Sequence, residues 1–267
     1  MMRGRQEATK GDGRRRQHWP LSVAFVAFVS FPLGAQSYRD PSLSVEQRVS
    51  DLLPRMTPEE KFWQLFMIPG SRDDPAHDYS AGVFGLQVEA IDSGTTAAFS
   101  HAARINSLQR WFRDSTRLGI PIIPFDETLH GLTRPGATAF PQAIALAATW
   151  DTSLMSEVAT AIARETRSRG IRQVLSPVVN ITRDARWGRT EETYGEDPLL
   201  ASQMGVAFVS AFERAGVITT PKHFVANVGE GGRDSWPIEV SRRQLEEVWF
   251  PPFRAVLGAG AGSVMTA

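Results

Sequence analysis

The sequence of 267 residues contains no cysteine. This absence excludes a disulfide framework and a thiolate nucleophile, so the stability of the fold must come from the burial of a hydrophobic core. The sequence also has no Gly-x-Ser-x-Gly motif and no Gly-rich phosphate-binding motif, and its histidines show no His-x-x-x-His spacing. These absences argue against a serine hydrolase, a nucleotide-binding enzyme and a zinc enzyme.

The chain has no net charge, because it contains 29 basic and 29 acidic residues, but the charges are unevenly distributed. Residues 1–35 hold six basic and two acidic side chains, and the rest of the chain therefore carries a small acidic excess. A nucleic-acid partner is not expected, because it would require a basic surface to neutralise its phosphates.

The basic N-terminal segment is followed by an apolar run at residues 21–31 and by the small residues Gly34 and Ala35. These are the three parts of a secretory signal peptide. A membrane span needs about 20 apolar residues, so an N-terminal anchor is the weaker interpretation. We therefore predict a signal peptide at residues 1–35, a linker at residues 36–44, and a secreted or periplasmic protein.

Beyond the linker, short apolar runs alternate with segments of helical periodicity. We expect strands at residues 83–88, 120–125, 172–179, 217–220 and 263–266. We expect helices at residues 96–115, 141–148, 154–167, 199–214 and 242–257. This alternation predicts βαβ units and a parallel sheet, in either a barrel or a doubly wound arrangement.

The number of strands is small for a closed barrel. A (β/α)₈ barrel needs eight strands, and only about five can be identified here. The sequence also stops inside the last expected strand, so we expect a truncated chain.

Two helix starts carry capping residues. Residues 57–60, Thr-Pro-Glu-Glu, predict a capping box with a proline in the first turn. Phe62, Leu65 and Phe66 would then lie on one face and are expected in the core. Asp197 precedes a proline in the same way, which favours a helix cap over a catalytic role.

Polar clusters follow three of the expected strands. They are DETLHG at residues 126–131, NITRDARWGRTEE at residues 180–192 and KHF at residues 222–224. The carboxyl ends of parallel strands meet at one face, which is where such folds place their chemistry. We therefore expect the three clusters to lie at the same rim.

So many charged groups at one rim could pair and desolvate around a polar ligand. A sugar suits them, because its hydroxyls accept from Arg and Lys and donate to carboxylates, and Trp187 would offer an apolar face to a pyranose ring. Each cluster also has a structural interpretation. His130 could be a structural histidine, and residues 180–192 could form an Arg–Glu network that holds a long loop.

Five sequence runs carry a resemblance to a known family. They are ETLHG at 127–131, GATAFP at 136–141, RDARWGR at 183–189, YGEDP at 194–198 and KHFVAN at 222–227. In this order and spacing they resemble the N-terminal domain of glycoside hydrolase family 3, over residues 45–267. The resemblance implies a (β/α)₈ barrel, here incomplete, in an enzyme that removes a terminal β-linked sugar with retention.

Retaining chemistry needs two carboxyl groups about 5 to 5.5 Å apart, one as nucleophile and one as general acid/base. The resemblance implies a nucleophilic Asp in a Ser-Asp-Trp-like segment, a few dozen residues beyond Ala267. The run KHFVAN departs from the Lys-His-Phe-Pro-Gly-His-Gly pattern of the β-N-acetylglucosaminidases. It is similar to the glucosidase and xylosidase branch, whose acid/base is a Glu on a following α/β sandwich domain. No catalytic carboxylate is therefore expected within this chain.

The resemblance does imply sugar-binding residues in this chain. Carried over by motif, Arg189, Lys222 and His223 would hold the hydroxyls of the terminal sugar, with Glu192 as a further candidate. Glu127 lies where many glucosidases have Asp and many xylosidase-like members have Glu, and its extra methylene favours a xyloside.

Two details of this assignment stay open. Asp126 is the alternative to Glu127 as the sugar contact. Lys222 and His223 are adjacent, and a regular strand would point them to opposite faces. If both side chains reach one ligand, the backbone between them must be irregular.

Two functions are expected, one for the full gene product and one for this chain alone. The full gene product would be an exo-acting β-glucosidase or xylan 1,4-β-xylosidase that acts on β-linked oligosaccharides or aryl glycosides in plant polysaccharide breakdown, without a cofactor or metal ion. The chain alone would be a non-catalytic sugar-binding fragment. An unrelated α/β hydrolase or metal enzyme is the third possibility, and strand ends that face apart or a pocket elsewhere would favour it.

Overall fold

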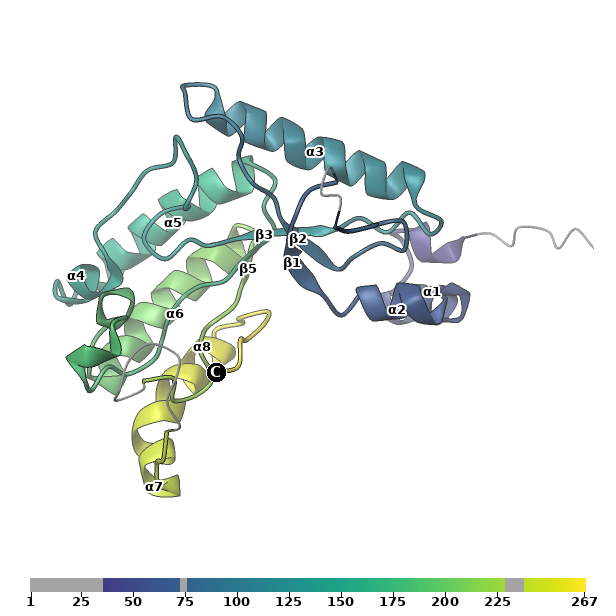
Figure 1. The fold of residues 1–267 in the computed structure, drawn as a ribbon. Coiled ribbons are helices and arrows are strands. Elements are labelled where there is room, and N and C mark those ends of the chain that lie inside the picture. The colour runs from purple at the N-terminus through teal and green to yellow at the C-terminus, as the bar shows by residue number, and fades with distance from the viewer. Residues whose placement is uncertain (1–35, 73–75, 229–237) are drawn as a thin grey trace, which may run out of the picture. The chain divides into compact units, whose positions relative to one another are not determined.

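The computed structural model describes residues 36–72, 76–228 and 238–267 (Figure 1). The predicted signal peptide at residues 1–35 lies outside the described residues. By its contacts the chain divides after Leu52 into two parts, which are described separately. None of the described helices is both long and apolar enough to cross a bilayer.

The first part contains a 3-10 turn, η1 (Ser37–Arg39), and a helix, α1 (Val45–Leu52). The backbone N–H of Tyr38 donates to Asp51 Oδ2 at 2.9 Å, and Arg48 Nε donates to the Tyr38 carbonyl at 2.8 Å. These two hydrogen bonds hold the turn against the helix.

The second part is built on a parallel sheet. Its strands are β1 (Met67–Pro69), β2 (Gly85–Gln87), β3 (Ile123–Asp126), β4 (Gln173–Val174) and β5 (Ile218–Thr219). They pair in the order of the sequence, β1-β2-β3-β4-β5, and every pair is parallel. A doubly wound sheet reverses its strand order at a switch point, and the described strands show no such reversal.

The expected strands are confirmed in position and shortened in length, with two differences. Strand β1 was not predicted, because three residues are too few to show an alternating pattern. The expected strand at 263–266 is reduced to a parallel bridge between Thr266 and Phe224. The hydrogen bond from Met265 N–H to the Pro221 carbonyl, at 3.1 Å, places this segment beside the continuation of β5.

Helices precede, connect and follow the strands. The main ones are α2 (Pro58–Trp63), after the short turn η2 (Leu53–Arg55), α3 (Ala97–Ser115), α4 (Ala143–Ala147), α5 (Thr152–Ser168), α6 (Pro198–Arg214) and α8 (Phe250–Gly258). Helix α5 packs against α6, and α6 packs against α8 (Figure 1). The close approach of α6 to α8 occurs at Gly205, where a Cβ atom would lie 2.8 Å from Val256 Cγ1.

The expected helix at 242–257 is interrupted. It begins as α7 (Arg242–Gln244), continues as a π-helical segment, η5 (Leu245–Trp249), and ends as α8. Pro251 and Pro252 have no backbone N–H to donate to the preceding turn, so the α-helical hydrogen-bond ladder cannot run through them. The N–H of Phe250 bonds instead to the Leu245 carbonyl, five residues back.

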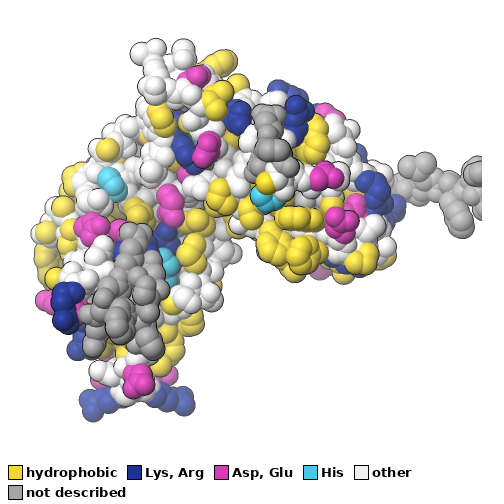
Figure 2. All heavy atoms as spheres, in the orientation of Figure 1, with side chains coloured by type: hydrophobic (Ala, Val, Ile, Leu, Met, Phe, Trp, Pro, Cys, Tyr) yellow, Lys and Arg dark blue, Asp and Glu magenta, His cyan; other side chains and the backbone are white. Residues whose placement is uncertain are grey.

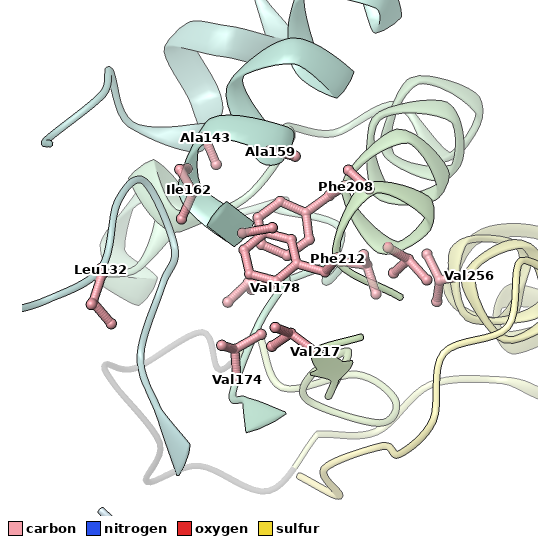
Figure 3. Close-up of a cluster of buried hydrophobic side chains, with 14 of the residues drawn as sticks. Leu132, Ala143, Ala159, Ile162, Val174, Val178, Phe208, Phe212, Val217 and Val256 are labelled. Atoms are coloured by element: carbon pink, nitrogen blue, oxygen red, sulfur yellow. The ribbon is translucent and has the colours of Figure 1, made fainter. Parts of the chain in front are cut away.

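The hydrophobic core lies between the sheet and helices α3, α5, α6 and α8. Figure 3 shows Val174 and Val217 of the sheet region near Phe208 and Phe212 of α6, with Ile162 of α5 beside them. The two phenylalanine rings stack with their centroids 4.4 Å apart. All five side chains are almost completely buried, which fixes β4 and β5 against the helical layer.

The two predicted helix starts are confirmed. Thr57 Oγ1 accepts from the Glu60 N–H at 3.2 Å, and Glu60 Oε2 accepts from the Thr57 N–H at 2.8 Å, which completes a capping box. Glu60 is also paired with Arg117 of the α3–β3 connection. Asp197 caps α6 by accepting from the Leu200 N–H at 2.7 Å.

The predicted core face beyond the first cap was wrong for Phe62 and Leu65, and confirmed for Phe66. Phe62 and Leu65 are 53% and 79% exposed. Helix α2 ends at Trp63, so the helical spacing does not extend to Leu65. Phe66 packs against the core together with Trp63, and their carbonyls accept hydrogen bonds from the backbone N–H groups of Gly85 and Phe84 at the start of β2.

Candidate functional site

The first side of the candidate site is the end of β3, where two acidic residues follow each other. Asp126 is 1% exposed, and its carboxylate accepts from Arg134 Nε at 2.6 Å and from Gln87 Nε2 at 3.1 Å. It also accepts from the backbone N–H of Glu127 at 2.9 Å. Asp126 is therefore held within the sheet, where it fixes the backbone from which the Glu127 side chain projects.

Glu127 is paired with a lysine from the far end of the described sheet. Lys222 Nζ donates to both carboxylate oxygens of Glu127, at 2.8 and 3.0 Å. The lysine side chain is 4% exposed and the glutamate side chain is 32% exposed. This pair joins the end of β3 to the segment after β5.

The Glu127 carboxyl has a perturbed pKa. Burial raises the pKa of Glu127 above its usual value, the Lys222 ammonium opposes this rise, and the carboxylates of Glu192 and Asp126 add to it. Glu127 thus lies within the electrostatic reach of both other acidic groups, although its only cationic contact at hydrogen-bond distance among the described side chains is Lys222.

The second pair comes from the long segment after β4. This segment contains two 3-10 turns, η3 (Ala185–Trp187) and η4 (Thr190–Glu192). Arg189 precedes η4 and Glu192 ends it, and the guanidinium contacts the carboxylate twice, with both distances 2.8 Å. Both side chains are mostly buried. The turn therefore presents a fixed bidentate ion pair.

His223 connects the two pairs. Its Nε2 lies 3.3 Å from Arg189 Nη1, and its backbone is continuous with Lys222. The peptide bond between Lys222 and His223 is cis. Glu127, Lys222, His223, Arg189 and Glu192 thus form one continuous series of contacts.

Asn180 is the part of the site to which the sequence argument assigned no role. Its Oδ1 accepts from the His223 N–H at 2.7 Å and lies 3.1 Å from His223 Nδ1. Its Nδ2 donates to the carbonyls of His223 and Val225, both at 3.0 Å. Its position directly after the apolar run at 174–179 could have identified it as a site residue. The other site residues were predicted because they too are polar residues that follow strands.

His130 has a structural contact in the loop that follows β3. His130 Nδ1 lies 2.9 Å from the Phe140 carbonyl, which fits the structural interpretation of this histidine. The loop closes tightly at Gly131, where φ is 136° and a Cβ atom would lie 2.3 Å from the Thr138 carbonyl oxygen. Glycine is therefore required at this position.

The expectation that Trp187 stacks on a sugar ring was wrong. Its side chain is 0% exposed and belongs to the hydrophobic core. The 3-10 turn η3 directs the Trp187 side chain inward, so its apolar surface is buried among other side chains. This burial stabilises the loop that carries it.

Figure 2 shows acidic, basic and histidine side chains next to one another on the face that it draws. Among the described residues, no group of three or more His, Asp or Glu side chains is placed to hold a metal ion.

A cavity of about 880 Å³ lies beside the segment that follows His223. It is lined by Val225, Ala226, Asn227, residues 238–241, Leu245 and Ala267. Glu239 is its only ionisable lining residue among those described, so this cavity does not bring together an alternative set of catalytic groups.

Comparisons with known proteins identify the family. The model of the glycosyl hydrolase family 3 N-terminal domain matches residues 57–267. A β-xylosidase of Formosa agariphila is 36% identical over 77% of this chain and 31% of its own length. A periplasmic β-glucosidase of Salmonella typhimurium is 33% identical over 82% of this chain and 28% of its own length.

A solved structure agrees with these matches. The β-glucosidase from Erythrobacter marinus superposes with a TM-score of 0.78 and 33% identity, over 87% of this chain and 33% of that chain. This chain spans about a third of the length of these relatives. With its parallel α/β sheet and its match to the N-terminal domain model over residues 57–267, the chain belongs to glycoside hydrolase family 3.

Proposed function

We propose that the protein containing this chain is an exo-acting retaining β-glycosidase, a β-glucosidase or β-xylosidase, and that this chain forms its glycone-binding region. The observation that carries the proposal is the continuous series of contacts from Glu127 through Lys222, His223 and Arg189 to Glu192. The names of the relatives, which are β-glucosidases and β-xylosidases, support the type of reaction.

The sheet supports a (β/α)₈ barrel as the scaffold. A barrel is wound in one direction, so its strands pair in sequence order and all run parallel, as β1 to β5 do. The bridge between Phe224 and Thr266 continues the same order with the next segment of the chain. We propose that this domain begins near residue 45, after a signal peptide at 1–35 and a linker at 36–44.

The paired charges suit the recognition of neighbouring sugar hydroxyls. A carboxylate accepts a hydrogen bond from one hydroxyl, and the cation beside it donates to the next. Glu127 with Lys222 forms one such unit, and Glu192 with Arg189 forms another. His223 lies between the two units, which supports a contact of His223 with the same ring.

The same pairing supports a binding role, rather than a reacting role, for these carboxylates. A retaining glycosidase needs an ionised nucleophile and a protonated acid about 5 to 5.5 Å apart. Glu127, Glu192 and Asp126 are each engaged by a cationic side chain at hydrogen-bond distance. We propose that an Asp nucleophile and a Glu acid/base, the latter on an α/β sandwich domain, come from parts of the protein outside this chain.

The substrate is a β-linked oligosaccharide or aryl glycoside. The longer side chain of Glu127, compared with Asp, reduces the space for a C6 hydroxymethyl group and favours xylose over glucose. The signal peptide proposed at 1–35 and the periplasmic relative in Salmonella support an extracytoplasmic location.

The proposal is tested by hydrolysis of 4-nitrophenyl β-D-xyloside and β-D-glucoside. We expect no turnover by the purified chain, and turnover by the chain extended with the downstream coding sequence. Turnover by the purified chain would contradict the assignment of its carboxylates to binding. Absence of turnover by the extended protein on both substrates would contradict the activity itself.

A further inference from the structure

We propose that Asn180 is a positioning residue that holds His223 as the neutral tautomer with its proton on Nδ1, so that Nε2 is the acceptor toward Arg189. The consequence for sugar recognition rests on the proposed function, whereas the tautomer can be measured independently of it. Asn180 directly follows the region of β4, and His223 follows β5, so the contact bridges two strand ends.

The amide of Asn180 has only one orientation that satisfies its neighbours. The carbonyls of His223 and Val225 can only accept, so the atom 3.0 Å from each of them must be the amide nitrogen. The backbone N–H of His223 can only donate, so the atom 2.7 Å from it must be the amide oxygen. Three backbone groups therefore fix Oδ1 as the atom that faces the imidazole.

This orientation decides which ring nitrogen carries the proton. Because Asn180 Oδ1 can only accept, His223 Nδ1 must donate across the 3.1 Å contact. At the other side of the ring, Arg189 can only donate, so His223 Nε2 must accept across the 3.3 Å contact. The two ends of the imidazole give the same tautomer independently.

Burial makes this arrangement specific. Asn180 is 1% exposed, and His223 and Arg189 are also buried, so water competes little for these hydrogen bonds. Two cationic groups, Arg189 and Lys222, flank His223, and their carboxylate partners are Glu192 and Glu127. A protonated imidazole would lose its acceptor toward Arg189 and would add a third cation to this cluster.

Asn180 thereby positions Arg189 through His223. The guanidinium is held by Glu192 through Nε and Nη2, and by His223 through Nη1. These contacts with Glu192 and His223 fix the orientation of the guanidinium within the site.

The test is the nitrogen NMR spectrum of the imidazole in the ¹⁵N-labelled chain, with the His223 signals assigned by their loss in His223→Gln. Protonated and unprotonated ring nitrogens resonate far apart, so the spectrum reports the tautomer directly. We expect a protonated Nδ1 and an unprotonated Nε2 in the wild-type chain. A protonated Nε2 with a bare Nδ1 would overturn the proposal without any variant.

Two variants test the role of Asn180. Asn180→Asp keeps the shape but puts a carboxylate beside Nδ1, so His223 should become protonated at a higher pH than in the wild type. Asn106→Asp, which adds the same charge at an exposed position on α3, should leave the His223 signals unchanged. In Asn180→Ala only the Arg189 contact still favours the Nδ1-protonated tautomer, so the Nε2-protonated form should become detectably populated, and an unchanged tautomer ratio would overturn the role of Asn180.

Titration with methyl β-D-xyloside separates this inference from the proposed function. We expect Asn180→Asp to weaken binding by about tenfold, while Asn106→Asp does not. Binding by the wild type with His223 in the Nε2-protonated form would overturn the role of Asn180 and leave the proposed function standing. The expected tautomer in a chain that binds no glycoside would overturn the proposed function and the positioning role that rests on it.

Discussion

Replacing Lys222 with methionine removes the cation from a largely buried ion pair and keeps the length of the side chain. Breaking a fully buried pair in this way costs about 3 to 5 kcal/mol of unfolding free energy. Glu127 is 32% exposed, so water compensates part of the loss. We expect Lys222→Met to lower the free energy of unfolding at pH 7 by about 1 to 3 kcal/mol.

This loss should depend on pH. Burial raises the pKa of Glu127 in the folded chain and Lys222 opposes the rise, so the substitution should raise this pKa further. A carboxyl whose folded pKa exceeds its unfolded value binds protons more tightly when folded, so the stability of Lys222→Met should increase as the pH falls through the folded pKa of Glu127.

Urea unfolding of the wild type, Lys222→Met, Glu127→Gln and the double variant at several pH values measures both effects. We expect a coupling of at least about 1 kcal/mol at pH 7, and Glu127→Gln should abolish the additional pH dependence. Lys61→Met, at an exposed position on α2, is the matched control and should cost little. Additivity within about 0.5 kcal/mol, or a loss that is equal at low and neutral pH, would refute the reasoning.

Three further predictions concern residues that stabilise the fold around the site. Trp187→Ala should lower the unfolding free energy by about 3 to 5 kcal/mol in urea titrations, and a selective loss of sugar binding without destabilisation would contradict its place in the core. Asp197→Ala should cost about 1 kcal/mol, because it removes the cap of α6, and an unchanged melting temperature would speak against that role. Glu213 accepts from Thr219 N and Oγ1, at 2.8 and 2.6 Å, so Glu213→Ala should cost about 1 to 3 kcal/mol and speed hydrogen exchange at the Thr219 amide; unchanged exchange would be the contrary result.

The helices could be predicted because their signals are local. The caps at Thr57 and Asp197 depend on side chains within one turn, and both form as expected. The π-helical interruption at 245–249 also has a local cause, because the two prolines that follow have no backbone N–H to donate. Apolar spacing alone does not predict this interruption. Phe62 and Leu65 were misplaced because spacing alone does not show where a helix stops.

The grouping of polar strand ends was predictable, whereas their pairing was not. The rule that parallel strands end at one face brings Glu127, Arg189 and Lys222 to the same rim. That Lys222 contacts Glu127, 95 residues away, depends on side-chain directions set by the tertiary fold.

The role of Trp187 could not be predicted from the sequence. An aromatic residue inside a charged segment is equally suited to contact a sugar or to anchor the loop in the core. Only its burial, which depends on the turn that carries it, distinguishes the two roles.

The proposed binding of the glycone by Glu127 is tested most directly by calorimetric titration of the chain with methyl β-D-xyloside and methyl β-D-glucoside. We predict that Glu127→Gln weakens binding of both by at least about tenfold, and that Glu157→Gln, at an exposed position on α5, leaves it unchanged. Equal affinities for the wild type and Glu127→Gln would contradict the claim.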